Sequence, residues 1–205
     1  MKRDKKILSA IISLGLVMSQ ASVAFAGQWT KSGKGRWQYI QDNSSYFRDG
    51  WKFIDGSWYY FSGYSMLNDR MLNGRFLVPV SEYDYYVKSD GKMANDGFCD
   101  TADSPGYMVF ANKQGQLVKG PFMVDDVLYD SFDDTGMINK TYCAGGLLRY
   151  INSENEKDYI KIMINRGKVL KEDGTPFSAD DEIFSQIKYL PKYDSKGNLL
   201  GAIQN

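Results

Sequence analysis

The sequence predicts an all-β protein, a solenoid-like array of short antiparallel β-hairpin repeats with a small C-terminal segment that contains one helix. Aromatic residues make up 15% of the chain and gather in short runs. Each run is followed by a polar turn that a glycine closes, and then by one apolar residue. The glycines at 91, 115 and 136 recur at intervals of 24 and 21 residues. A period of about 20 residues is typical of repeat architectures.

The clearest repeat begins at Gly50 and reads Gly-Trp-Lys-Phe-Ile-Asp-Gly-Ser-Trp-Tyr-Tyr-Phe, followed by Gly63 and Met66. An upstream copy of its second half begins at Gly35. Weaker copies cover residues 84–93, 107–117 and 128–137. A hairpin of about 20 residues cannot bury a core of its own, so we expect the hairpins to stack on one another.

These motifs resemble the cell-wall-binding repeats of Gram-positive surface proteins, the choline-binding and glucan-binding repeat family. The family pattern is Gly-Trp, a polar turn, Gly-x-Trp-Tyr-Tyr-Phe, a second turn and Gly-x-Met. The resemblance is clear over residues 35–66. From there to about residue 140 the repeats are degenerate, since no Trp follows Trp58. It implies a non-catalytic protein that binds a repeating cell-envelope polymer, with choline-bearing teichoic acid as the first ligand and glucan as the second.

The resemblance also implies ligand cages between hairpins. In the family a cage takes the Trp of Gly-Trp, the Trp of the Trp-Tyr-Tyr strand and a Tyr from the next strand. Matched to this sequence, the family pattern implies a first cage of Trp37, Trp51 and Tyr60. Trp58 would start a second cage with a tyrosine of the next repeat. The full set of implied ligand-binding residues is Trp37, Tyr39, Trp51, Trp58, Tyr60, Tyr85 and Tyr86.

Aromatic rings suit either ligand. A quaternary ammonium group cannot donate a hydrogen bond, and aromatic faces hold it at about 0.5–2 kcal/mol each. The same rings would stack on the faces of a glucan, whose hydroxyls need polar partners such as Asp42, Asn43, Asp55 and Asn68. Every ring could equally serve only to pack the repeats, so a structural or signalling repeat protein without ligand stays an alternative.

The N-terminus reads as a secretory signal peptide over residues 1–26. Four basic residues precede a short apolar core over 7–17, and Ala24-Phe-Ala26 is an Ala-x-Ala cleavage signal. The alternative is an uncleaved membrane anchor, because 7–26 is close to the length of about 20 residues that spans a bilayer. Cleavage implies a secreted, cell-wall or cell-surface protein that has no contact with the membrane afterwards.

The charge balance argues against nucleic acid as a partner. The full chain has 25 basic and 25 acidic residues, and cleavage after Ala26 removes four basic residues and one acidic residue, which leaves a net charge of −3. No basic run stands out in the remainder, whereas a nucleic-acid-binding domain carries a basic patch.

We predict three segments: the signal peptide over 1–26, the repeats over 27–145, and a cap or small module over 146–205 that begins at Gly145-Gly146. In the last segment Tyr159-Ile-Lys-Ile-Met-Ile164 favours a strand. Ser178 and Asp181 resemble a capping box, and Ile183, Phe184, Ile187 and Leu190 recur at helical spacing, with Pro191 ending the helix.

The residues with reactive side chains predict no catalysis. Cys99 and Cys143 could form a disulfide in an exported protein, or they could be two thiols that act as small hydrophobes. The chain has no histidine, so we expect no metal site and no nucleophile–histidine pair. We expect no cofactor either. A secreted enzyme with its chemistry in 147–205 is the third alternative.

Overall fold

The structure is a computed structural model, and it describes residues 27–68, 70–72, 83–131, 135–141, 143–149, 159–178, 180–185 and 189–204. The predicted signal peptide lies outside these residues. The chain forms two compact units, Met1–Phe47 and Arg48–Asn205, which we call the first and second unit and describe separately.

The first unit contains one described hairpin. Strands β1 (Gln28–Lys31) and β2 (Trp37–Ile40) pair antiparallel, with Trp29 opposite Tyr39. The aromatic run of the repeat copy that begins at Gly35 therefore forms a strand.

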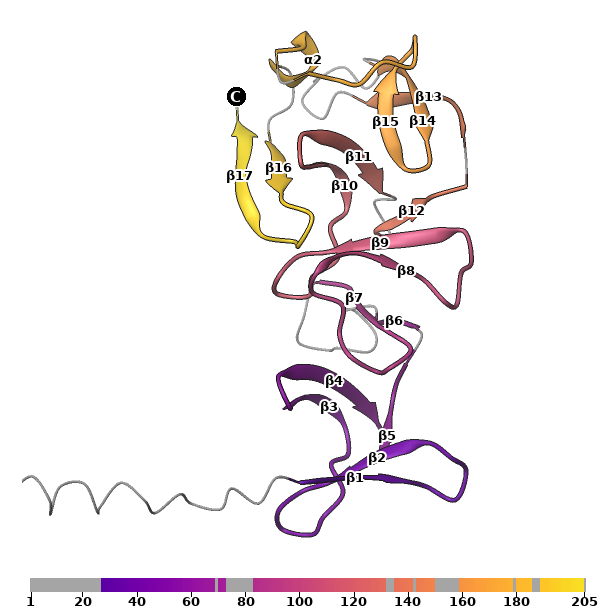
Figure 1. Cartoon of the computed structure of the whole chain (residues 1–205), viewed down its shortest axis with the longest axis vertical. Coiled ribbons are helices and arrows are strands. Elements are labelled where there is room, and N and C mark those ends of the chain that lie inside the picture. The colour runs from indigo at the N-terminus through magenta and orange to yellow at the C-terminus, as the bar shows by residue number, and fades with distance from the viewer. Residues whose placement is uncertain are drawn as a thin grey trace, which may run out of the picture. The chain divides into compact units, whose positions relative to one another are not determined.

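The second unit begins with three small sheets of antiparallel hairpins (Figure 1), ordered β3-β4-β5, β6-β7 and β12-β9-β8. Their strands are β3 (Gly50–Ile54), β4 (Ser57–Ser62), β5 (Ser65–Met66), β6 (Arg70–Leu72), β7 (Tyr85–Val87), β8 (Gly97–Asp100), β9 (Tyr107–Ala111) and β12 (Met137–Asn139). The predicted array of antiparallel hairpins is confirmed.

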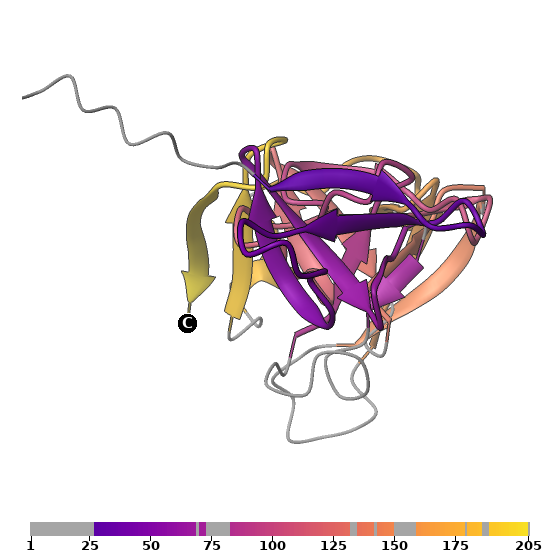
Figure 2. The same ribbon diagram turned by 90° about the horizontal axis from the view of Figure 1, so that it is seen from below.

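A seven-stranded sheet follows, in the order β13-β14-β15-β11-β10-β16-β17. Its strands are β10 (Gly120–Val124), β11 (Val127–Ser131), β13 (Cys143–Arg149), β14 (Tyr159–Asn165), β15 (Lys168–Lys171), β16 (Tyr189–Tyr193) and β17 (Leu199–Gln204). Neighbouring strands are antiparallel except for β10 and β16, which are parallel. Figure 2 shows β16 and β17, in yellow, running next to each other at the end of the chain.

Three of the hairpins are closed by the same two-residue turn. Asp55-Gly56, Asp125-Asp126 and Arg166-Gly167 each have positive φ at both residues and join strands in direct register. This is the type I′ geometry, whose twist matches that of the flanking strands. The acidic pair Asp125-Asp126 is therefore a turn, and Asp126 lies 3.0 Å from the Lys192 ammonium.

A second kind of turn recurs along the chain. In it a glycine N–H donates to the carbonyl three residues earlier, at 2.8–3.0 Å, as Gly91 does to Lys88. An Asp or Asn side chain often fixes this turn by accepting a backbone N–H two residues on, as Asp90 does from Lys92. The same turn occurs at Gly35, Gly91, Gly115, Gly174 and Gly197. The repeat turn thus continues into the C-terminal segment.

The turn glycine of one repeat packs on the last apolar residue of the repeat before it. A Cβ built on Gly115 would lie 3.0 Å from Met93 Cγ and closer still to its sulfur and methyl group. Gly91 meets Met66 in the same way, and Gly136 meets Leu117. All three glycines have positive φ, so the backbone conformation and the close packing both favour a residue without a side chain.

The core is divided among successive hairpins. One cluster joins Tyr60, Leu72 and Val87, and the next joins Tyr86, Ala94, Val109, Ala111 and Leu117. A third is built around Phe110, Phe122, Ile138 and Tyr193, and the last lies in the seven-stranded sheet around Met123, Leu128, Ile162 and Leu190. Each hairpin thus buries its apolar side against its neighbours.

The C-terminal segment shares its sheet with the repeats before it. β13 runs through Gly145-Gly146, and β15 pairs with β11, where Lys168 lies opposite Tyr129. The domain boundary at 145 stays a prediction, but the backbone pairing continues on both sides of it.

The predicted helix is present but shorter than its periodicity indicated. Helix α2 covers Glu182–Ser185, and the Ser178 N–H donates to the Asp181 carboxylate at 2.6 Å, which is one of the two hydrogen bonds of a capping box. Hydrogen bonds from Lys171 and then from Ser178 lower the pKa of Asp181.

The predicted end of the helix differs from the structure. Leu190 and Pro191 lie in β16 and not in the helix, so the prediction that Pro191 ends the helix is wrong. Leu190 is fully buried in the sheet, and a short apolar run does not distinguish a buried strand from a helix.

Both cysteines are free thiols, which is one of the two alternatives that the sequence left open. Cys99 lies in β8 and is half-buried, whereas Cys143 lies at the start of β13 and is exposed. Burial is the largest cause that raises the pKa of the Cys99 thiol.

Among the described residues, no helix has the length and apolar character needed to cross a membrane.

Replacing Gly115 by Ala should destabilise the protein more than replacing Gly56 by Ala. Both glycines have similar φ, +83° and +79°, but a Cβ at Gly56 meets no atom within 4 Å. The two variants share a backbone strain of about 1–2 kcal/mol. Only Gly115→Ala displaces Met93, which should add about 1 kcal/mol or more in chemical denaturation. Equal losses in the two variants would contradict the packing role of Gly115.

The two thiols should differ in reactivity. In the protein purified without reductant, a thiol reagent should label Cys143 quickly and Cys99 slowly at pH 8, because Cys99 is half-buried and its raised pKa leaves less thiolate. Mass spectrometry of the labelled peptides measures both rates. Absence of any label after denaturation would mean that the two residues form a disulfide.

Candidate functional site

Three aromatic side chains of the second unit come from three strands. Trp51 lies in β3, Trp58 in β4 and Tyr85 in β7. Trp51 stands opposite Tyr60 across the hairpin, with ring centroids 5.1 Å apart, and its ring also lies 5.2 Å from that of Tyr85. Both contacts are edge-to-face, the geometry that aromatic pairs prefer. Tyr60 and Tyr85 thus hold the Trp51 indole in place.

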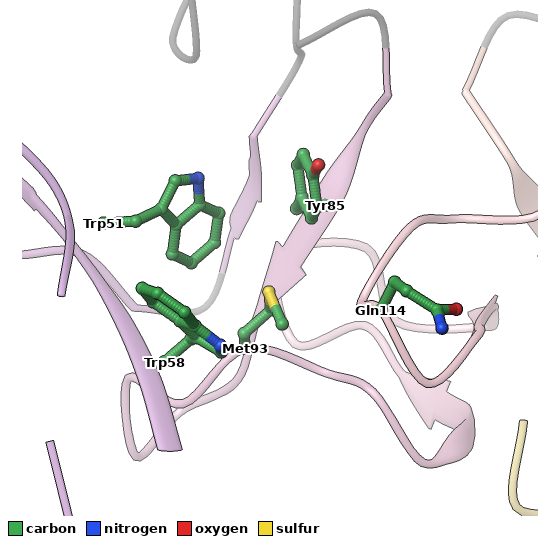
Figure 3. Close-up of a pocket in the computed structure, with 5 residues that line it drawn as sticks. All are labelled: Trp51, Trp58, Tyr85, Met93 and Gln114. Carbon is green, nitrogen blue, oxygen red and sulfur yellow. The ribbon is translucent and has the colours of Figure 1, made fainter. Parts of the chain in front are cut away.

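These rings surround a pocket of about 360 Å³. The described residues that line it are Trp51, Trp58, Tyr85, Met93 and Gln114. Figure 3 shows the two indoles and the phenol around one space, with the Met93 side chain between Trp58 and Tyr85 and Gln114 beyond it. The volume lies at the lower end of the range of about 300–1,000 Å³ for small-molecule sites.

The stacking of hairpins positions Met93 in this pocket. The Met93 N–H donates to the Trp58 carbonyl at 2.8 Å, and Met93 also bridges to Val87 of β7. Gly115 of the following turn packs on its thioether, which leaves Met93 only 8% exposed. Met93 therefore forms a wall of the pocket that three successive repeats hold in position.

The chemistry of the lining is aromatic and uncharged. None of the described lining residues carries a formal charge, and their polar groups are the Gln114 amide, the Tyr85 hydroxyl and the two indole N–H groups. Trp58 is 42% exposed, so its ring is accessible to a ligand from solvent. Such a pocket can hold an apolar group or a cation that needs no hydrogen-bond acceptor.

Of the predicted ligand-binding residues, the structure brings Trp51, Trp58 and Tyr85 together. Tyr60 lies behind Trp51 in the core, and burial raises the pKa of its phenol, with the charge of Asp49 as the second cause. Tyr86 is 1% exposed, and its hydroxyl accepts a hydrogen bond from the Ala102 N–H at 2.8 Å.

The remaining two predicted residues, Trp37 and Tyr39, belong to the first unit. Trp29 contacts both of them edge-on, at 6.3 and 5.2 Å between ring centroids. The Lys31 ammonium lies 4.7 Å from the centroid of the Trp37 ring, a cation–π contact within the hairpin. The cage of Trp37, Trp51 and Tyr60 combines residues of both units and stays a prediction.

Sequence reasoning missed Met93 and Gln114 as lining residues. Met93 had a signal, since it is the apolar residue that follows the turn glycine in the repeat. Gln114 had none, because it lies in a turn one repeat further along the chain. Its contribution depends on how the hairpins stack.

No metal centre is found within the described ranges, where no three Cys, Asp or Glu side chains gather closely enough to hold an ion.

No protein-family model matches the chain, and no curated protein matches it. Among solved structures, the chain is similar to the Cpl-1 endolysin of phage Cp-1 in complex with a peptidoglycan analogue, with 23% identity and a TM-score of 0.47 over 76% of this chain and 38% of that one. It is also similar to choline binding protein F from Streptococcus pneumoniae, with 19% identity and a TM-score of 0.45 over 70% and 40% of the two chains.

A third similar structure is the choline binding domain of Spr1274 in Streptococcus pneumoniae, with 26% identity and a TM-score of 0.35 over 47% of this chain and all of that domain. The present chain spans about two fifths of the length of the endolysin and of choline binding protein F. The chain is similar to choline-binding repeat proteins, as its Gly-Trp and Trp-Tyr-Tyr-Phe motifs implied.

Proposed function

We propose that the second unit binds a quaternary ammonium group, the choline of a Gram-positive teichoic acid, in the pocket of Trp51, Trp58 and Tyr85. The observation that carries this proposal is the convergence of three aromatic rings and the Met93 thioether on one space, with no charged residue among the described residues that line it. We further propose that the protein is secreted, attaches to the cell wall and has no catalytic activity.

The energetics of the pocket suit a weak ligand that is presented many times. The pocket partly removes the cation from water, so each of the three aromatic faces falls in the upper part of the range of about 0.5–2 kcal/mol; at about 1–2 kcal/mol each, they give a total of about 3–6 kcal/mol. An affinity of that size corresponds to a dissociation constant between several millimolar and tens of micromolar. Since a teichoic acid carries many choline groups, several molecules attached to one wall would gain by avidity.

Glucan is the second candidate, and the placement of the polar residues supports it less. Asn43 accepts hydrogen bonds from Ser45, and Asn68 donates to the Ser89 carbonyl at 3.3 Å. Asp55 forms the type I′ turn of the β3–β4 hairpin. These polar side chains serve turns and loops, whereas a sugar in the pocket would have as polar partners the Gln114 amide, the Tyr85 hydroxyl and the two indole N–H groups.

Choline should quench or shift the tryptophan fluorescence in a saturable way. All four Trp residues lie between 29 and 58, and two of them line the pocket. We expect a dissociation constant between about 0.05 and 10 mM, and tetramethylammonium should compete. No saturable change up to about 100 mM choline, a concentration far above that range, would exclude this ligand. The same titration with dextran oligosaccharides tests glucan.

Replacing Trp58 by Leu should lower choline affinity more than about tenfold, because the loss of a ring face removes about 1.4 kcal/mol or more. Trp58→Phe should have a smaller effect. Thermal stability should change little, since Trp58 is 42% exposed. Tyr64→Leu is the matched control, because Tyr64 is an exposed ring of the same unit outside the pocket. Equal effects of the two Leu variants on isothermal titration would contradict the proposed cage.

A further inference from the structure

Among the described residues of the second unit, two interfaces between successive hairpins share the same backbone pattern. In the first copy the Met93 N–H donates to the Trp58 carbonyl at 2.8 Å. In the second copy the Leu117 N–H donates to the Asp84 carbonyl at 2.9 Å. Leu117 takes the place of Met93, and Asp84 takes the place of Trp58.

A second hydrogen bond fixes the same alignment. The Ala94 N–H donates to the Tyr86 carbonyl at 2.8 Å, and the Val118 N–H donates to the Phe110 carbonyl at 2.9 Å. Tyr85 precedes Tyr86 as Val109 precedes Phe110, so Val109 occupies the position of the cage tyrosine. The second interface therefore has Asp84, Val109 and Leu117 where the first has Trp58, Tyr85 and Met93.

The side chain at the Trp58 position is thus an acid, and it is buried. The Asp84 side chain is 4% exposed. The Lys119 ammonium lies 2.7 Å from Asp84 Oδ2, and the Lys119 side chain is 32% exposed. Lys119 follows Leu117 by two residues, so its ammonium reaches Asp84 from the same turn region that supplies the wall of this interface.

We propose that this second interface is a cation site which the chain fills with its own Lys119 ammonium ion. Where the first interface offers aromatic faces to a cation from solvent, the second offers a buried carboxylate to a cation of the protein. A primary ammonium ion can bring its nitrogen as close to a carboxylate oxygen as the 2.7 Å of Lys119, whereas the methyl groups of a quaternary ammonium hold its nitrogen further away and give it no N–H to donate. The second interface is therefore closed to choline and is held together without ligand.

The proposal does not depend on choline binding by the first interface, because it concerns the ion pair of Asp84 and Lys119 alone. It also gives a stoichiometry. Of these two interfaces, the one that contains Asp84 takes no cation from solution, which leaves at most one site, the one that contains Trp58.

Chemical rescue tests the proposal. Lys119→Ala leaves the Asp84 carboxylate buried without its partner, so the melting temperature at pH 7 should fall by roughly 10 °C. Added n-propylammonium replaces the missing part of the side chain and should restore at least about half of that loss in a saturable way. Tetramethylammonium at equal ionic strength should restore none of it, because it has no N–H group.

The controls separate a specific site from an effect of salt. Lys161→Ala removes an exposed ion pair with Glu172 and should respond to neither cation. If Lys119→Ala does not fold alone, refolding with n-propylammonium should recover the β signal in circular dichroism, and failure to do so would overturn the proposal. Equal action of the two cations, or a Lys119→Ala variant that melts like the wild type, would also overturn it.

Discussion

The contact between a turn glycine and the last apolar residue of the preceding repeat is the constraint on which the second unit depends. It requires a residue without a Cβ at a position of positive φ, and it sets how closely one hairpin can approach the next. Among the described residues the contact recurs at Gly91 with Met66, Gly115 with Met93 and Gly136 with Leu117, and Gly167 of a hairpin turn packs on Ile138 in a similar way. Because each hairpin is too small to bury its own core, this repeated contact sets the spacing of the buried clusters.

The same contact determines what lies between the hairpins. It leaves one residue near the start of the aromatic strand, the second residue of β4 or the residue just before β7, next to the apolar wall of the following repeat. Where that residue is Trp58, the wall of Met93 and the ring of Tyr85 complete an aromatic pocket. Where it is Asp84, the neighbouring lysine supplies the counter-charge. One backbone arrangement thus supports two chemically different interfaces, one with Trp58, Tyr85 and Met93 and the other with Asp84, Val109 and Leu117 at the same three positions.

The sequence predicts the hairpin array well because its signals are local. The spacing of the glycines and the aromatic runs give strands β3 and β4, and Asp55-Gly56 gives their turn. The structure of the C-terminal segment was harder to predict, because its apolar residues do not repeat in the same pattern as those of the hairpins. Its turns at Gly174 and Gly197 nevertheless follow the repeat geometry, which only the backbone hydrogen bonds reveal. Leu190 shows the limit of periodicity, since a buried position fits a helix and a strand equally well.

The site was predictable only in part for the same reason. The rings of Trp51 and Trp58 belong to one hairpin and carry a clear motif, whereas Met93 and Gln114 come from later repeats. Their places in the pocket depend on the distance between stacked hairpins, which no local pattern encodes. The tyrosines of β7 are adjacent in sequence, but the alternation of a strand turns Tyr85 toward the pocket and Tyr86 into the core.

The most direct test of this account is a nuclear Overhauser measurement on the complex with choline, using protein labelled at the methionine methyl groups. We expect contacts from the trimethylammonium protons of choline to the Met93 methyl group and to the Trp58 indole. We expect no contact to the Met66 methyl group, which packs under Gly91. Contacts to Met66 or to the indole of Trp29, without contact to Met93, would contradict a cage that is built by the stacking of consecutive hairpins.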